Sequence, residues 1–231
     1  MVSGGLGHRL GTPIVAQSNA RRVGHMSFPD QGFPNIGGFL DAYAEQVNRA
    51  LATVSRDHLA AAAKLLSEAL AADAQLYSCG NGGSAAISNH LVCDHTKGVC
   101  TDTGLKPRVH SLSATVEMLT AIANDIDYAE VFSYQVGLLG RRGDVLITIS
   151  SSGNSENVTR AILKAREIGM KSIALTGFEG GRTRDLADVA LHVEADNYGV
   201  VEDCHQALMH VLAQYIRMSH MPGDLIAQRR F

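Results

Sequence analysis

The sequence predicts an α/β fold in which one parallel β-sheet is covered by helices on both of its faces. Apolar runs of strand length alternate with segments in which apolar residues recur at helical spacing. Short polar turns separate each run from the helical segment after it, as in the crossovers that parallel strands require. The run at 145–149 is apolar almost throughout, which is typical of a strand buried on both faces.

The individual elements follow from where these runs begin and end. Turn residues such as Gly80, Asn124 and Gly143 delimit the segments. Segment 97–106 is polar and contains glycine, so we expect it to be a connection. We predict strands at 74–79, 107–113, 145–149, 171–177 and 189–194, and helices at 84–94, 115–123, 131–139, 158–168, 182–187 and 201–218.

Two amphipathic helices are predicted before the first strand, between Gly38 and Ala72. Their apolar faces either complete a subunit interface or pack on the chain's own sheet, and the sequence favours neither. Residues 1–37 are rich in Gly, Ser, Pro and Arg without periodicity, so we predict a disordered extension, or an upstream start with Met26 inside it. The domain then spans 38–220, and 221–231 form a C-terminal tail.

The composition of the 231 residues excludes several classes of protein. With 45% hydrophobic residues, the chain can bury the core of one domain. A formal net charge of −3 offers no basic field for nucleic acid, so the expected partner is a small molecule or another protein. No apolar run is long enough to span a membrane and no signal peptide is evident, which predicts a cytoplasmic protein without a membrane partner. The four cysteines show no metal-binding spacing and are expected to be free thiols.

The turn after the first strand, at 80–84, has the composition of an anion site. Its glycines let a ligand approach the backbone closely, and the N–H groups and positive dipole end of the following helix attract a phosphate ester. His90 and Asp94 follow four residues apart on that helix and therefore project from one face. Phosphate binding and acid–base or metal chemistry are expected side by side.

A second turn of this kind, at 150–155, follows the strand at 145–149. It contains four serine hydroxyls and opens a helix, which is enough to bind a phosphate without Lys or Arg. Taken alone, it is at least as readily explained as an ordinary helix cap rich in Ser and Asn. The carboxyl ends of parallel strands meet at one edge of the sheet, so the two turns together favour a bound anion.

The first turn also fits the G-x-G-x-x-A pattern of dinucleotide-binding proteins, through Gly80, Gly82 and Ala85. A dinucleotide site needs an acidic residue after the next strand to bind the ribose, and this chain has Ser-Leu-Ser-Ala-Thr at 111–115 instead. No Gly-Lys-Ser/Thr follows the turn, so a nucleoside-triphosphate loop is excluded as well. Both nucleotide hypotheses are therefore disfavoured.

The last long helix supplies a third group of candidate residues. Glu202 and His210 lie two turns apart near one face, whereas His205 points elsewhere and is explained as a surface or packing histidine. Singly, His210 is more often a half-buried structural residue than a catalyst. With His90 and Asp94, the group becomes a set of two histidines and two carboxylates that suits zinc or a similar divalent ion.

These segments, in this order, resemble one known family. The resemblance rests on the turn at 80–84 with His90 four residues before a carboxylate, on Asn124-Asp125, on the strand entering the serine turn at 150–155, on 175–181, and on the Glu-x-x-His-x-x-x-x-His helix at 202–210. They are similar to the sugar isomerase (SIS) domain, and within it to the phosphoheptose isomerases. The resemblance covers about 39–219.

The resemblance implies a single SIS domain whose N-terminal helices serve oligomerisation in a homotetramer. It implies an enzyme that interconverts sedoheptulose 7-phosphate and D-glycero-D-manno-heptose 7-phosphate. The product would supply heptose for bacterial lipopolysaccharide and other surface polysaccharide. The resemblance also implies proton transfer between C1 and C2 by Asp94, with His210 as acid–base partner. One zinc ion per subunit would be held by His90, Asp94, Glu202 and His210. The phosphosugar would be bound by Asn81, Gly82, Gly83, Ser84, Asn124, Asp125, Ser150, Ser151, Ser152, Ser155 and Glu202.

Three positions depart from the family pattern. Asp94 replaces the usual Glu and reaches less far, Glu202 replaces Gln and adds a negative charge, and Thr115 replaces an Asp often found there. These departures leave a second hypothesis, a non-catalytic SIS module that binds a phosphosugar or the bacterial replication initiator. The retained histidines and carboxylates favour the enzyme.

Overall fold

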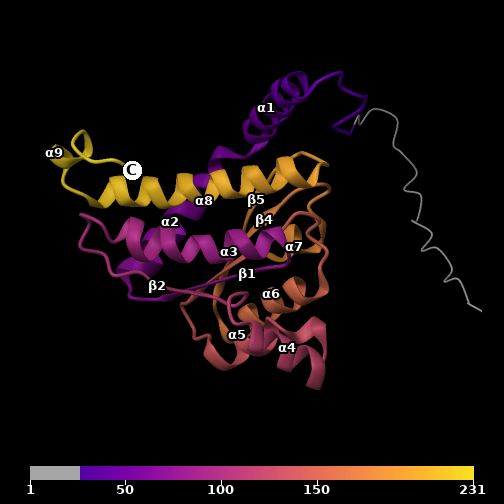
Figure 1. Cartoon of the computed structure of the whole chain (residues 1–231). Helices are drawn as coiled ribbons and strands as arrows, with labels where there is room; N and C mark the ends of the chain where they lie inside the picture. Colours follow the sequence, from indigo (N-terminus) through magenta and orange to yellow (C-terminus); the bar gives the residue numbers. More distant parts are fainter. Residues whose placement is uncertain (1–26) are drawn as a thin grey trace, which may run out of the picture.

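The computed structural model describes residues 27–231, which form one β-sheet with helices on both faces (Figure 1). The strands are β1 (Gln75–Gly80), β2 (Arg108–Ser111), β3 (Val145–Ser150), β4 (Lys171–Thr176) and β5 (Val189–His192). They pair in parallel in the order β2-β1-β3-β4-β5. The predicted α/β fold with a parallel sheet is confirmed, and each predicted strand is present.

The order of the strands reverses the direction of winding between β1 and β3. From β1 the chain moves to β2 on one side, and β3, β4 and β5 then extend the sheet on the other side. Ligands of such sheets bind beyond the carboxyl ends of the strands at the point of reversal. The two turns singled out in the sequence follow β1 and β3 and therefore flank this point.

The helices lie on the two faces in separate groups (Figure 1). One face carries α2 (Arg56–Ala71), α3 (Gly83–Cys93) and α8 (Tyr198–His220). The opposite face carries α4 (Val116–Asp125), α5 (Ser133–Leu139) and α6 (Glu156–Ile168), with α7 (Gly181–Leu186) packed on β4, β5 and α6. Every crossover from one strand to the next thus adds a helix that covers the sheet.

Alternate residues of the central strands enter two different cores. Leu76 of β1 and Ile147 of β3 belong to the core beneath α2, α3 and α8. Their neighbours Tyr77 and Leu146 belong to the core beneath α5 and α6. Side chains of a strand alternate between faces, and burial of each large one contributes about 1.5–3 kcal/mol, so both faces of the sheet stabilise the fold.

The segment after α3 differs from the sequence-based expectation. The helix continues as a π-helix over Asp94–Val99 instead of giving way to a polar connection at 97. His95 and Val99 are buried four residues apart in this segment, which packs against α8. Threonine hydroxyls, including that of Thr96, donate to the carbonyl four residues earlier. A polar segment thus remains helical because a few buried residues hold it against a neighbouring helix.

The first helix, α1 (Ile36–Thr53), extends from the body of the molecule (Figure 1). Only Ala50 is buried within α1, whereas α2 buries several residues, including Leu66, in the core. The α2 helix therefore packs on the chain's own sheet. Of the predicted extension at 1–37, residues 1–26 lie outside the described residues, and the ring of Phe28 lies against those of Phe39 and Tyr43.

The C-terminal tail contacts the body of the domain after a short helix, α9 (Gly223–Ile226). Arg217 of α8 donates to the carbonyl of Arg230 and lies over the ring of Phe231. Arg217 and Arg229 both pair with Asp102. No helix in the described part of the chain is long and apolar enough to cross a membrane.

Candidate functional site

A pocket of about 150 Å³ lies between the turns that follow β1 and β3, at the reversal of winding. It brings together most of the predicted phosphosugar-binding residues, and none of the residues that line it is Lys or Arg. The lining residues are Asn81, Ser84, Ile149, Ser150, Ser151, Ser152, Ser155, Tyr198 and Glu202. Hydroxyl and amide groups at two helix starts, together with the carboxylate of Glu202, therefore surround a small polar space. The two helix starts favour an anion there, and the Glu202 carboxylate opposes one.

The serine turn is held in a tight conformation by its own side chains and by a second loop. The hydroxyl of Ser150 accepts a hydrogen bond of 3.2 Å from the Gly153 N–H. Gly153 has a positive φ of 65°, and a Cβ there would lie 1.8 Å from the carbonyl oxygen of Gly180, so only glycine fits. The buried hydroxyl of Ser151 has no hydrogen-bond partner among the described residues, which leaves it available to a ligand.

Two residues that the sequence did not single out join the turns. Asn157, which is buried in the first turn of α6, exchanges two hydrogen bonds of 2.9 Å with the side chain of Asn81. The same Asn157 oxygen accepts from the Val158 N–H, and the Tyr128 hydroxyl donates to Asn81 at 2.9 Å. These bonds set the distance between the start of α3 and the start of α6.

The carboxylate of Glu202 lies directly over the first turn of α3. A Cβ built on Gly83 would be 2.3 Å from Glu202 Oε2, so the absence of a side chain at 83 permits this approach. The positive end of the α3 dipole favours a negative charge there. In this structure Glu202 thus occupies part of the surface that the sequence assigned to the phosphate turn.

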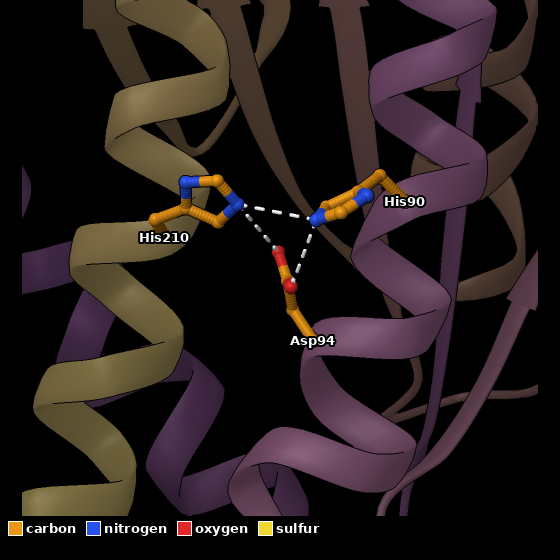
Figure 2. Close-up of side chains that lie close together, drawn as sticks. All are labelled: His90, Asp94 and His210. Atoms are coloured by element: carbon orange, nitrogen blue, oxygen red, sulfur yellow. Dashed lines mark hydrogen bonds and ion pairs between the residues drawn. The ribbon is translucent and has the colours of Figure 1, made fainter. Parts of the chain in front are cut away.

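His90, in the last turn of α3, and Asp94, the residue directly after that helix, meet His210 of α8 (Figure 2). The Nε2 atom of His90 lies 3.1 Å from Asp94 Oδ1 and 3.1 Å from His210 Nε2. The Nε2 atom of His210 lies 3.6 Å from Asp94 Oδ2. Asp94 is 15% exposed, and its Oδ2 atom is buried without a hydrogen-bond partner among the described residues.

This donor set fits a divalent metal ion. Zinc lies about 2.0–2.2 Å from imidazole nitrogen and carboxylate oxygen, so two ligand atoms at tetrahedral positions are about 3.3 Å apart. The two imidazole nitrogens are 3.1 Å apart, and each lies 3.1 or 3.6 Å from the nearer Asp94 oxygen, so one ligand atom from each residue lies within 4.8 Å of the others. A bound cation would also compensate the buried oxygen of Asp94 and the close approach of the two imidazoles.

The pocket and the cluster of His90, Asp94 and His210 lie along one pair of parallel helices. Gly83 of α3 lies against Glu202 of α8, and His90 lies against His210 further along both helices. These contacts are seven residues apart on α3 and eight on α8, roughly 10–12 Å along a helix. A ligand with a phosphate at one end and a reactive carbon at the other matches this arrangement.

Three of the predicted residues, Glu202, Asn124 and Asp125, do not belong to the cluster of His90, Asp94 and His210. The three ligand atoms that converge come from His90, Asp94 and His210, whereas Glu202 lines the pocket. The side-chain nitrogen of Gln206, a residue not predicted from the sequence, lies 3.0 Å from His210 Nε2. Asn124 donates to Asp125 at 2.8 Å at the exposed end of α4, and neither residue lines the pocket.

His205 is a packing residue, one of the two possibilities left open for it. It is fully buried on α8, and this burial lowers the pKa of its imidazole to about 4. A histidine with such a pKa is neutral at pH 7 and contributes no charge to the site. The catalytic candidates on α8 are therefore Glu202 and His210.

Comparisons with known proteins agree with the geometry. A family model described as "SIS domain" matches residues 39–177. A phosphoheptose isomerase of Helicobacter pylori (strain P12) is 39% identical over 176 residues, 76% of this chain and 90% of that protein. One from Aliarcobacter butzleri (strain RM4018) is 36% identical over 181 residues, 78% of this chain and 95% of that protein.

Solved structures show the same similarity in three dimensions. The phosphoheptose isomerase of Neisseria gonorrhoeae superposes with a TM-score of 0.70 at 35% identity, over 79% of this chain and 98% of that one. The phosphoheptose isomerase of Francisella tularensis gives a TM-score of 0.72 at 29% identity, over 79% of this chain and 96% of that one.

Proposed function

This chain belongs to the SIS domain family and, within it, to the phosphoheptose isomerases, and from that membership we propose that it interconverts sedoheptulose 7-phosphate and D-glycero-D-manno-heptose 7-phosphate. It is thus a sugar-phosphate isomerase, and we propose that it serves heptose synthesis for lipopolysaccharide and related polysaccharides. The observation that carries the proposal is the convergence of His90, Asp94 and His210 two helical turns from a pocket of hydroxyl groups.

The reaction requires proton movement at two neighbouring carbons. An aldose and a ketose exchange through an enediol, in which a base removes a proton from one carbon and returns it to the other. We assign this role to Asp94, whose carboxylate lies between the two imidazoles, and we assign His210 as its acid–base partner. The partner moves the second proton between the oxygens on C1 and C2, so the overall reaction consumes no further reactant.

The phosphate end of the substrate is assigned to the two turns. Backbone N–H groups at the starts of α3 and α6 and the hydroxyls of Ser150, Ser151, Ser152 and Ser155 bind it without a cationic side chain. Asn81, Gly82, Gly83 and Ser84 complete this end of the site. We also assign Asn124 and Asp125 to the sugar, although both lie outside the pocket.

We propose one zinc ion per subunit, held by His90, Asp94 and His210. Glu202 is proposed as the fourth ligand, which requires its carboxylate to turn from Gly83 toward this cluster. When bound, zinc supplies a Lewis acid that polarises the substrate carbonyl. A homotetramer is proposed as well, supported by α1, which exposes Ile36 and Leu40 and would leave an apolar surface uncovered in a monomer. The free thiols of all four cysteines support a cytoplasmic location.

The test is incubation of the purified protein with sedoheptulose 7-phosphate, with the aldose product followed by NMR and zinc measured per chain. We expect the aldose to form and close to one zinc per chain. A protein that binds the sugar phosphate but forms no aldose, and that holds no stoichiometric metal, would instead be the non-catalytic SIS module.

A further inference from the structure

Tyr198 is the only aromatic residue among those that line the pocket between the turns after β1 and β3. It is the first residue of α8, it lies three residues before the predicted start of that helix, and 63% of its surface is exposed. The other lining residues are Ser, Asn, Glu and the fully buried Ile149, so the ring of Tyr198 is the exposed apolar group at the edge of the pocket. An exposed aromatic ring at the edge of a polar pocket is suited to cover the carbon chain of a bound ligand.

The ring does not project freely into solvent, because Phe178 holds it. The two rings meet edge to face, with centroids 4.7 Å apart and planes at 88°. Phe178 follows β4 and has a φ of 47°, a left-handed conformation that residues other than glycine rarely adopt. Its N–H donates to the carbonyl of Ala195 at 2.8 Å, which stabilises this unusual backbone. Strained backbone of this kind is concentrated near ligand sites.

The backbone of Tyr198 is fixed as well. The side chain of Asn197 caps α8 by accepting from the Val200 N–H at 3.0 Å, and it donates to the carbonyl of Phe28 at 2.9 Å. Gly177, next to Phe178, packs closely on Val201: a Cβ built on Gly177 would lie 2.5 Å from Val201 Cγ1. The loop that carries Phe178 and the first turn of α8 therefore form one rigid unit beside the pocket.

We propose that Tyr198 is a further substrate-contacting residue, whose ring packs against the carbon chain next to the phosphate, and that Phe178 is the positioning residue that orients it. The inference rests on the proposed function, since it takes the ligand of the pocket to be a sugar phosphate. The serines hold the phosphate, and the aromatic face covers the C–H groups of the adjoining carbons. Such a contact exists in the bound substrate and in the transition state alike, so it affects KM more than kcat.

The first experiment measures KM and kcat for sedoheptulose 7-phosphate in four variants. Tyr198→Ala should raise KM about tenfold, which corresponds to the loss of one good apolar contact, with kcat within about twofold. Tyr198→Phe should stay within about twofold of the parent, because it keeps the ring face. Phe178→Ala should raise KM by less than Tyr198→Ala, and Phe178→Tyr, which keeps the edge contact, should restore it.

Tyr215→Ala is the matched control, since Tyr215 is also an exposed tyrosine on α8 but does not line the pocket. It should leave KM unchanged. A purely structural role for Tyr198 would lower the melting temperature of Tyr198→Ala and leave KM at the parent value, and that result would overturn the inference.

A second experiment detects the contact without turnover. The chain contains no tryptophan, so Tyr198→Trp introduces a single fluorescent reporter at the pocket. Sedoheptulose 7-phosphate should shift its emission to shorter wavelength in a saturable manner, and inorganic phosphate alone should shift it less, because phosphate lacks the carbon chain.

The two experiments distinguish the inference from the proposed function. An emission change with sugar phosphate in a chain whose parent forms no aldose supports the contact and contradicts the isomerase. A parent that turns over while the reporter does not respond contradicts the contact and supports the isomerase. Absence of any emission change with the sugar phosphate overturns the inference whatever the activity.

Discussion

Asn81 and Asn157 form a reciprocal amide pair, in which each side chain donates to the other at 2.9 Å across the point where the winding of the sheet reverses. Asn81 belongs to the turn after β1 and Asn157 to the first turn of α6, so the pair bridges the two turns proposed to bind the phosphate. A phosphate bound between the turns depends on their spacing, because its oxygens need donors from both sides at hydrogen-bonding distance.

Replacement of Asn157 by Leu should therefore impair both stability and substrate binding. The Asn81 amide and the Val158 N–H lose their partner, and each unsatisfied buried group costs about 1–3 kcal/mol in the free energy of unfolding. Urea denaturation measures this loss, and KM for sedoheptulose 7-phosphate should rise. Asn48→Leu, at an exposed position of α1, is the control. A destabilised Asn157→Leu protein with an unchanged KM would mean that the pair does not set the geometry of the site.

Gly83 tests the position of the Glu202 carboxylate. Gly83→Ala should displace that carboxylate, because the new Cβ would lie 2.3 Å from Oε2, and KM should rise. The fold should survive, since a carboxylate at the end of a side chain can move and Ala favours a helix over Gly by up to about 1 kcal/mol. In a Glu202→Ala background the same substitution should have no further effect on KM. Equal effects in both backgrounds would show that the added methyl group meets something other than Glu202.

The serine turn should account for a large part of phosphate affinity. Substitution of Ser150 and Ser155 together by Ala removes two hydroxyls from the pocket, and each lost hydrogen bond to a charged group costs about 1.5–3 kcal/mol. Calorimetric titration with the sugar phosphate should show the weaker binding. Ser219→Ala, near the end of α8 and outside the pocket, serves as control. Unchanged affinity in the double variant would place the phosphate elsewhere.

His205 should make the stability of the protein fall in mild acid. Its pKa is lowered by burial to about 4 in the folded chain, against 6.5 for the free side chain. As the pH falls below 6.5, the unfolded chain takes up a proton that the folded chain does not, so stability is complete above pH 6.5 and is lost towards pH 4. The loss is about 3 kcal/mol for this one group.

His205→Gln should therefore reduce the slope of the unfolding free energy between pH 6.5 and 4, as measured by urea denaturation. It should not abolish the slope, because burial also lowers the pKa of His95 and His192. An identical pH profile for His205→Gln and the parent would contradict the assignment.

The parts of this structure that were predictable are those set by local pattern. The buried strand at 145–149 and the turns at 80–84 and 150–155 are continuous in sequence, so their composition predicts both fold and anion site. Parallel strands then bring the two turns to one edge without further information. His90 and Asp94 were predictable for the same reason, since four residues on a helix define one face.

The residues that escaped prediction depend on contacts between distant segments. Asn157 is separated from Asn81 by 76 positions. An asparagine in the first turn of a helix is ordinarily expected to be exposed and hydrated, so its partner could not be predicted. Tyr198 lines the pocket and packs against Phe178, which lies in the loop after β4 and is 20 positions earlier in the chain. Gln206 carried a usable signal, because it is four residues from both Glu202 and His210 and must share their face.

The most direct test of the central claim compares the parent chain with Asp94→Asn, incubated with sedoheptulose 7-phosphate in D₂O, followed by NMR. Asp94→Asn keeps the shape of the side chain but removes the base and its charge, and urea denaturation confirms that the fold is intact. We expect the parent to form the aldose with deuterium incorporated at C2, and Asp94→Asn to form none. Asp94→Glu should retain activity because it keeps a carboxylate there. Full activity in Asp94→Asn would exclude Asp94 as the base and direct the search to Glu202, and no aldose from the parent would contradict the isomerase itself.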